Sequence, residues 1–147
     1  MTVQPLNEPI LGYAPGSPER NSIIQEIDRQ MSEVIEIPCI INGEEIFTGD
    51  TIPQVIPHIH GHILANVHLA GRKEMESACS AAVNAQKSWI EIGLEERCKI
   101  FEKCADLLAG EWRMRVNAST MLNQSKTAFQ AEIDSACELI DLSLIHI

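Results

Sequence analysis

The sequence predicts an α/β protein in which one helix and a few short strands precede a series of helices. Three observations support this fold class. Asn42-Gly43 separates two β-prone runs, residues 63–69 alternate with a period of two, and apolar residues recur at helical spacing from Lys73 onward. Hydrophobic residues make up 45% of the 147 residues and charged residues 22%, so we expect one globular domain with a core.

The N-terminal residues 1–16 are expected to form an extended arm. They are rich in residues that disfavour regular structure, namely Pro5, Pro9, Gly12, Pro15 and Gly16. Ser17 then offers an N-cap oxygen and Pro18 suits the first helical position. Apolar residues at helical spacing predict a helix over about residues 18–35, stopped by Pro38.

A β-hairpin is predicted between Cys39 and Thr48. Asn42-Gly43 accepts the positive φ values of a type I′ turn, which connects two strands directly. Residues 63–69 then predict a third strand, since apolar residues there recur at every second position.

The second half of the chain is predicted to be helical. One helix extends from Lys73 to near Gly93, and a second ends at Gly110, which suits a C′ position. A further helix is expected over residues 111–122, and another over about 127–140.

Charge and hydropathy exclude several kinds of partner. The chain has 21 acidic and 11 basic residues and a formal charge of -10, which opposes binding to nucleic acid or to anionic membranes. No apolar run approaches the ~18–20 residues that span a bilayer. We see no signal peptide, and no Arg-rich mitochondrial presequence precedes Arg20.

The five cysteines are predicted to be reduced, structural thiols. Their number is odd, they are scattered, and none belongs to a C-x-x-C pair. Four lie on predicted apolar faces or strands, where a thiol is expected to be packed and little ionised.

His58-Ile59-His60-Gly61-His62 is an alternative metal site. Alternate residues of a strand share one face, so three imidazoles could meet a zinc or copper ion. No Asp, Glu or Cys at ligand spacing completes the set, and a His-rich polar turn after Pro57 is the commoner explanation.

Asn123-Gln124-Ser125-Lys126-Thr127 is similar to the end of a phosphate-binding loop. Such loops need a glycine before the lysine and another five residues earlier, but Ser125 and Thr120 occupy those positions. The segment also follows a predicted helix, so we interpret it as a turn between two helices.

The last predicted helix carries four carboxylates: Glu132, Asp134, Glu138 and Asp141. Asp134 and Glu138 are four residues apart and therefore neighbours on a helix surface. No partner base or nucleophile can be named, so these residues alone indicate a solvated, structural face.

Several segments together resemble the pyrroline-5-carboxylate dehydrogenases, which are aldehyde dehydrogenases. The resemblance rests on the order and spacing of these segments: Asn7-Glu8-Pro9-Ile10, Gly16-Ser17-Pro18-Glu19-Arg20, Ile37-Pro38-Cys39, Asn42-Gly43, Pro57 with His60-Gly61-His62, and Lys126-Thr127 followed by Gln130-Ala131-Glu132-Ile133-Asp134. It extends from about residue 7 to Asp141. Lys126-Thr127 is similar to a Gly-Lys turn of that superfamily, with Ser125 in place of the glycine.

The resemblance implies a function and a cofactor. Such enzymes oxidise L-glutamate γ-semialdehyde, the open form of pyrroline-5-carboxylate, to glutamate with NAD in proline breakdown in the mitochondrial matrix, and they form homo-oligomers. A cysteine thiolate attacks the aldehyde and a glutamate activates water. Both groups lie beyond the matched stretch, so we expect the chain alone to be inactive and to bind no NAD tightly.

The resemblance also implies a division of the chain and one candidate site residue. Residues 1–16 are the arm, 17–141 the N-terminal part of the dehydrogenase domain with an incomplete nucleotide-binding domain, and 142–147 a divergent tail that suggests a truncated product. Glu138 lies on the helix that borders the aldehyde tunnel in the family, so we expect it near the substrate. Asp134 and Glu132 are weaker candidates.

Two other functions remain open at this point. One is the metal-binding module of the His58–His62 run, and the other is a stand-alone helical interaction protein that docks through the apolar faces of residues 75–108. For a fragment, we expect more exposed apolar surface than a monomer of this size normally has.

Overall fold

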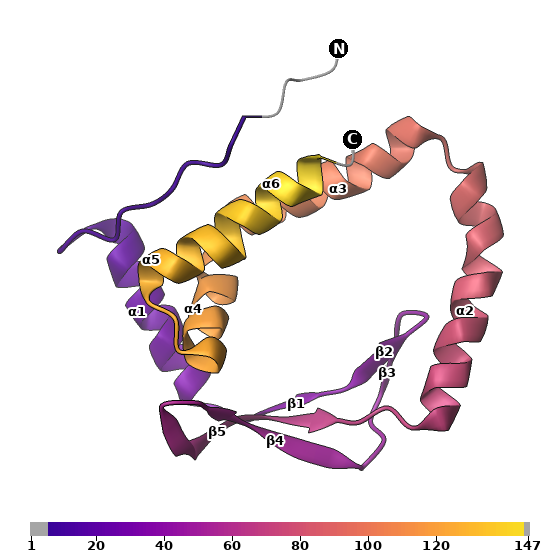
Figure 1. The fold of residues 1–147 in the computed structure, drawn as a ribbon, viewed down its shortest axis with the longest axis horizontal. Coiled ribbons are helices and arrows are strands. Elements are labelled where there is room, and N and C mark those ends of the chain that lie inside the picture. The colour runs from indigo at the N-terminus through magenta and orange to yellow at the C-terminus, as the bar shows by residue number, and fades with distance from the viewer. Residues whose placement is uncertain (1–5, 146–147) are drawn as a thin grey trace. The chain divides into compact units, whose positions relative to one another are not determined.

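The computed structural model describes residues 6–145, which divide into two compact units. The first unit combines residues 6–32 with residues 94–145. The second unit comprises Glu33–Gly93. Each unit contains its own helices, and the second holds all strands of the described residues (Figure 1).

In the first unit the arm leads into helix α1, Pro18–Met31. The Ser17 hydroxyl accepts a hydrogen bond from the Arg20 amide at 3.3 Å, as an N-cap should. The prediction that this helix continues to residue 35 is wrong. It ends at Met31, where the Ser32 hydroxyl bonds the Arg29 carbonyl at 2.7 Å, and Ile35 pairs in a strand instead.

The first unit has three further helical segments, which together with α1 form two packed pairs (Figure 1). They are α3 (Leu94–Ala109), α4 (Arg113–Gln124) and a run formed by α5 (Ala128–Ala131), η1 (Glu132–Cys137) and α6 (Glu138–Leu144). Helix α4 packs against α1 around Tyr13, Ile23 and Ala118. Helix α6 packs against α3 around Ala105 and Ile140.

The second unit contains the predicted hairpin. Strands β2 (Cys39–Ile41) and β3 (Glu44–Ile46) pair antiparallel, and Asn42 and Gly43 adopt φ values of 54° and 81°. The hairpin prediction and its reason are therefore confirmed, since these positive φ values are those the turn requires.

A separate three-stranded sheet has the order β1-β5-β4. Strand β5 (Ile59–His68) contains the third strand predicted over residues 63–69 except Leu69, and it begins four residues earlier. Strands β1 (Ile35–Ile37) and β4 (Thr51–Ile56) were not predicted. Strand β4 is an edge strand that tolerates Pro53, and its register shifts beside Gln54 and Val55.

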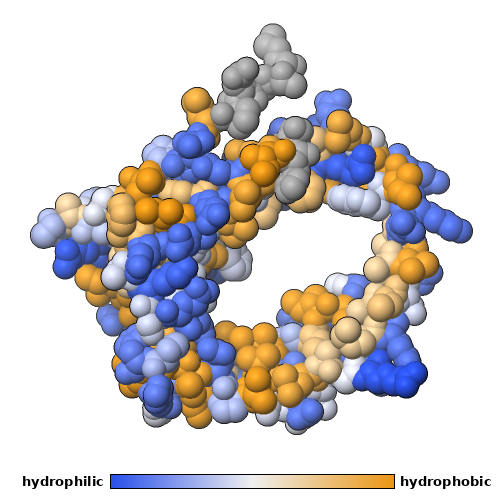
Figure 2. Space-filling model, in the orientation of Figure 1, coloured by the Kyte–Doolittle hydropathy of each residue, from blue (hydrophilic) through white to orange (hydrophobic). Residues whose placement is uncertain are grey.

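Helix α2, Arg72–Glu91, follows β5, and none of its residues is buried. Large apolar side chains are also exposed on the strands of the second unit, and Ile40 is 70% exposed. Figure 2 shows apolar residues on the surface of the molecule. The unit therefore has exposed apolar faces, and more exposed apolar surface than usual is expected from the sequence. No helix within residues 6–145 combines the length and apolar character needed to cross a bilayer.

Candidate functional site

The helical run from Ala128 to Leu144 carries all four carboxylates noted in the sequence. It begins at Thr127, whose hydroxyl accepts from the Gln130 amide at 3.3 Å while the Gln130 side chain bonds back to the Thr127 amide at 3.0 Å. This reciprocal arrangement is a capping box. Ser125, just before it, adopts a left-handed φ of 55°, and the segment is a turn between helices, as predicted.

The middle of this run is a π-helical turn. The amide of Glu138 donates to the carbonyl of Ile133, five residues earlier, so the turn holds one residue more than an α-helical turn. The extra residue rotates everything after it by about 100° relative to an uninterrupted α-helix. The turn therefore decides which way Glu138 faces.

Glu132 opens the π turn and is fully buried, with 0% exposure. The sequence expectation of a solvated acid is wrong for this residue. Its carboxylate accepts hydrogen bonds from the Leu11 amide at 2.8 Å, the Tyr13 hydroxyl at 2.7 Å and the Asn117 side-chain amide at 2.8 Å. A buried carboxylate is tolerable here because its oxygens are saturated with donors.

Arg113 supplies the counter-charge and joins three segments of the first unit. Its Nε lies 3.2 Å from a Glu132 oxygen, and its Nη1 pairs with Glu8 of the arm. Its Nη2 donates to the Pro9 carbonyl at 2.7 Å and also reaches Glu132. Arg113 is 5% exposed and Glu132 is fully buried, so their ion pair is a buried one rather than a surface contact.

The arm is held against the helices by these polar contacts. Besides the bonds to Glu132 and Arg113, the Glu8 amide donates to Asp141 at 2.8 Å. The part of the arm that the structure describes, residues 6–16, is thus held to the helices at Glu8, Pro9, Leu11 and Tyr13. Residues 1–5 of the arm predicted over residues 1–16 lie outside the described residues. We refer to Glu8, Tyr13, Arg113, Asn117 and Glu132 as the buried polar cluster.

The cluster shifts the proton affinities of its members. Burial alone raises the pKa of Glu132, but hydrogen bonds from Arg113, Leu11 and Tyr13 outweigh it and hold the pKa below its ordinary value. Burial, followed by the hydrogen bond to Glu132, raises the pKa of Tyr13. The pKa of Arg113 is raised as well, since its bonds to Glu132 and Glu8 outweigh the opposing effect of burial.

Cys137 closes the π turn next to the cluster. Its thiol lies 3.8 Å from a Glu132 oxygen and 3.6 Å from Arg113 Nη2. Burial first, and then the charge of Glu132, raise the pKa of this thiol, so it is a poor nucleophile. The cluster holds a stable charge arrangement and offers no accessible base or nucleophile.

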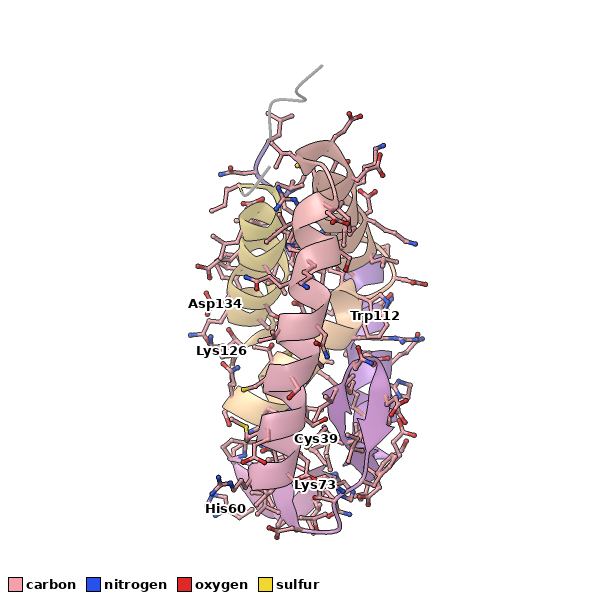
Figure 3. All side chains as sticks on the ribbon, turned by 90° about the vertical axis from the view of Figure 1, so that its right-hand side faces the viewer. Cys39, His60, Lys73, Trp112, Lys126 and Asp134 are labelled. Carbon is pink, nitrogen blue, oxygen red and sulfur yellow. The ribbon has the colours of Figure 1, made fainter. Side chains whose placement is uncertain are left out.

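The other carboxylates of the run have separate environments. Glu138 is exposed, and no ion pair or side-chain hydrogen bond holds it within residues 6–145. Asp134 forms an ion pair with Lys126 at 2.7 Å on the surface (Figure 3). The structure therefore does not bring Asp134 and Glu138 into one acid pair, and Glu138 presents an exposed carboxylate that is not already held in an ion pair within residues 6–145.

No sequence pattern predicts a role for Tyr13, Arg113 or Asn117. Their bonds to Glu132 connect residues separated by 119, 19 and 15 positions. A helical residue with an apolar neighbour on either side, such as Glu132 between Ala131 and Ile133, is a weak signal for a buried acid. This local context does not indicate which residues bond to Glu132, so the cluster could not be predicted from the sequence.

The histidine run lies at the turn between β4 and β5. His58 is in the turn, while His60 and His62 belong to β5, with His60 near the end of the sheet (Figure 3). Within residues 6–145, no three His, Cys, Asp or Glu side chains are grouped to hold a metal ion.

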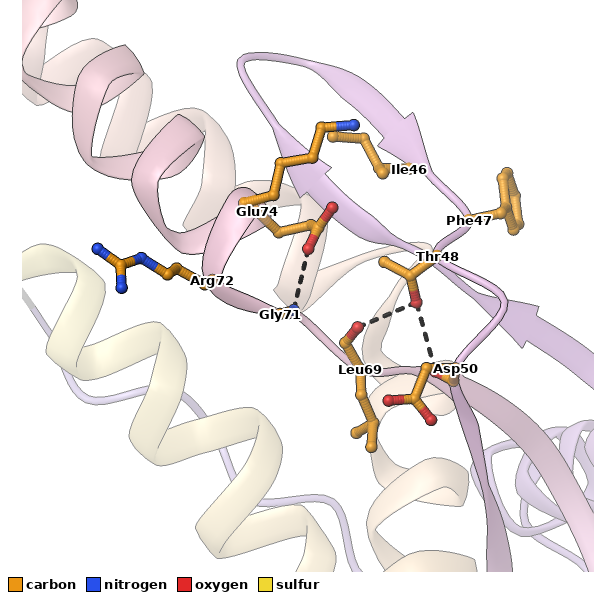
Figure 4. Close-up of a pocket in the computed structure, with 9 residues that line it drawn as sticks. Ile46, Phe47, Thr48, Asp50, Leu69, Gly71, Arg72 and Glu74 are labelled. Carbon is orange, nitrogen blue, oxygen red and sulfur yellow. Dashed lines mark hydrogen bonds between the residues drawn. The ribbon is translucent and has the colours of Figure 1, made fainter.

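A depression lies at the N-terminus of α2, lined by Phe47, Thr48, Leu69 and residues 71–74 (Figure 4). The Thr48 hydroxyl bonds the Leu69 carbonyl at 3.0 Å, and the Gly71 amide donates to Glu74 at 3.0 Å. This strand-to-helix turn does not fit the phosphates of a dinucleotide, because the Glu74 carboxylate already occupies the helix N-terminus.

The cysteines of the described residues are all free, as predicted. The expectation that they are packed is wrong for Cys79 and Cys104, which are exposed. Cys98 and Cys137 are buried, and Cys39 is intermediate. Cys79 lies on α2 and Cys104 on α3, on helical faces that the described residues 6–145 leave exposed.

Comparison with known proteins identifies the class. Residues 47–144 match the model of the aldehyde dehydrogenase family. The chain therefore belongs to the aldehyde dehydrogenase family.

The relatives it matches share one description. The chain is 42% identical over 136 residues to delta-1-pyrroline-5-carboxylate dehydrogenase of Agaricus bisporus, covering 92% of this chain and 25% of the relative. It is 41% identical over 135 residues to the human mitochondrial protein of that name, covering 92% of this chain and 24% of the relative. The chain thus spans about a quarter of the length of these relatives.

Solved structures show the same fold for this portion. The chain superposes on delta-pyrroline-5-carboxylate dehydrogenase from Mycobacterium tuberculosis, bound with NAD and cobalamin, with a TM-score of 0.95 and 39% identity. The match covers 99% of this chain and 27% of that one. A Thermus 1-pyrroline-5-carboxylate dehydrogenase with bound NAD gives a TM-score of 0.89 at 27% identity, covering 98% of this chain and 28% of that one. The fold is therefore that of the N-terminal portion of these dehydrogenases.

Proposed function

We propose that the chain is the N-terminal segment of an NAD-dependent dehydrogenase that oxidises L-glutamate γ-semialdehyde, the open form of pyrroline-5-carboxylate, to glutamate. The observation that carries the proposal is the 42% identity over 92% of the chain to a relative named for this activity. The TM-score of 0.95 to another such dehydrogenase supports it from the fold.

Within this function the described residues contribute a scaffold and one substrate-side carboxylate. NAD supplies hydride acceptance in the complete enzyme. The turn that starts α2 does not fit its phosphates, so no step of the cofactor chemistry is assigned to residues of this chain. The nucleophilic cysteine and the water-activating glutamate of such enzymes are likewise assigned outside it.

Glu138 is the residue of this chain that we assign to the substrate side. It is exposed, it follows the π turn directly, and its carboxylate lacks a side-chain partner among residues 6–145. A carboxylate in that position can orient a substrate through its ammonium group or set the charge near the reacting aldehyde. Asp134 is less suited because Lys126 already pairs with it.

The proposal extends to location and arrangement. Relatives from rat, human and cattle are named as mitochondrial, which supports a mitochondrial enzyme of proline breakdown. Residues 17–141 would form the N-terminal part of its dehydrogenase domain, and divergence from the family would begin only after residue 144, where the family match ends. The complete enzyme would be a homo-oligomer.

A chimera tests this function. Residues 7–141 replace the matched segment of the Agaricus bisporus relative, and NADH formation with pyrroline-5-carboxylate is measured. We expect turnover by the chimera, and none by the 147-residue chain or by the relative without its N-terminal quarter. A chimera that folds and binds NAD, but leaves pyrroline-5-carboxylate unoxidised, would overturn the proposal.

A further inference from the structure

The buried polar cluster touches both ends of the π turn. Arg113 contacts Glu132, the first residue of the turn, and lies 3.6 Å from the thiol of Cys137, the last. The Pro9 carbonyl accepts from Arg113 at 2.7 Å and from the Cys137 thiol at 3.8 Å. Both ends of the turn are thus held by the guanidinium of Arg113, which is itself bonded to the Pro9 carbonyl of the arm.

A π turn needs such support because it is rarer than an α-helical turn and interrupts the regular hydrogen-bond pattern. Rotation by about 100° separates the two forms, so a helix that relaxed to the α form would turn Glu138 to another face. Glu138 is the next residue after the turn and receives its direction from it.

We propose that Glu132, acting through Arg113, is a positioning residue that holds the π turn and thereby fixes the direction of the Glu138 side chain. The role of Glu138 rests on the proposed function, whereas the link from Glu132 to the turn does not. A carboxylate suits position 132 because the side chain is fully buried and both of its oxygens accept hydrogen bonds from donors around it. An amide or an apolar side chain cannot accept all of them.

The first test measures the turn itself, in the 147-residue chain. Glu132→Gln keeps the size of the side chain but places an NH₂ group against donors. We expect the Glu138 amide, which donates across the π turn, to lose protection from hydrogen exchange by roughly tenfold to a hundredfold. The amides of α3, which do not bond to the cluster, serve as an internal reference.

Asp134→Asn is the matched control, because it removes the same charge from the same turn at an exposed position. It should leave the Glu138 amide unchanged. Should Glu132→Gln unfold the whole unit, Tyr13→Phe replaces it, since this change removes one donor to Glu132. Unchanged protection of the Glu138 amide in a folded Glu132→Gln or Tyr13→Phe chain would overturn the proposal.

The second test measures the consequence for the reaction in the chimera described above. Glu132→Gln and Glu138→Gln should each raise KM for pyrroline-5-carboxylate while KM for NAD is unchanged. In the double variant the effect of Glu132→Gln should disappear, because the residue that it positions is already altered. Additive effects in that cycle would contradict a positioning role, whereas an inactive chimera would count against the proposed function and leave the exchange result in place.

Discussion

Glu132→Ala is the change from which we expect the largest loss of stability. The substitution removes the carboxylate that faces Nε of Arg113, a residue that is 5% exposed, and leaves Glu8 as its ion-pair partner among the described residues. It also takes the acceptor from Tyr13 and from the Leu11 amide. Breaking a buried ion pair by removing one partner costs about 3–5 kcal/mol, a large share of the about 5–15 kcal/mol that stabilises a domain.

The matched control is Asp134→Ala on the same turn. Its ion pair with Lys126 is also 2.7 Å long, but the two side chains are 43% and 31% exposed. Solvent screens such a pair, so we expect a loss of only about 0–1 kcal/mol. The two variants thus remove the same chemical group and differ in burial.

Urea unfolding followed by tryptophan fluorescence measures both variants. The chain has two tryptophans, and in a Trp89→Phe background the signal comes from Trp112, which precedes Arg113. We expect the midpoint of unfolding to fall much further for Glu132→Ala than for Asp134→Ala, at similar m values. Losses within about 1 kcal/mol of each other would refute the reasoning that burial makes the Glu132 pair structural.

The remaining predictions concern pH, the counter-ion, thiol reactivity and local stability. The pKa of Glu132 is lower in the folded chain, so its contribution is full above the ordinary carboxyl pKa of about 4.3 and is lost as pH falls through the lower folded value; the stability difference between wild type and Glu132→Gln should shrink in acid urea titrations. Arg113→Lys should lower the free energy of unfolding by about 1–3 kcal/mol, since one ammonium cannot replace a guanidinium that bonds to Glu132, Glu8 and the Pro9 carbonyl together, and calorimetry would detect this. A disulfide reagent should modify exposed Cys79 quickly and Cys137 only after denaturation, as mass spectrometry of peptides would show; equal rates would contradict the assigned burial. Amides of α2, which has no buried residue, should exchange faster than those of α4, and slower exchange in α2 would contradict its lack of cover.

Elements with a local cause were predictable from the sequence. Asn42-Gly43 specifies its turn through the φ values of two adjacent residues, and Ser17-Pro18 specifies a helix start within one turn. Both depend on neighbouring residues alone, so no knowledge of the rest of the fold was needed.

Elements with a distant cause were not predictable. Pro53 indicates a break in a strand, yet β4 forms because that proline lies on the sheet edge, and edge position is a property of the whole sheet. Residue Ile35 suits a helix by spacing, but it pairs with Ala65 in a parallel strand.

The buried polar cluster is the clearest case of a distant cause. Glu132 has the sequence context of a helix-surface acid, and its burial follows from an arm more than a hundred residues earlier that folds back over it. Glu138 could be named only through resemblance to a family, since an exposed acid carries no local signal of a substrate.

Substrate preference of the chimera tests the central claim most directly. The claim is that this segment belongs to a dehydrogenase for the semialdehyde of glutamate, and not to an aldehyde dehydrogenase of another specificity. The measurement is kcat/KM for pyrroline-5-carboxylate against that for propionaldehyde, which lacks both the ammonium and the carboxylate. We predict that the chimera prefers pyrroline-5-carboxylate as the parent relative does and that Glu138→Gln narrows this preference; a chimera that oxidises propionaldehyde equally well or better, with the parent's NAD affinity intact, would contradict the account.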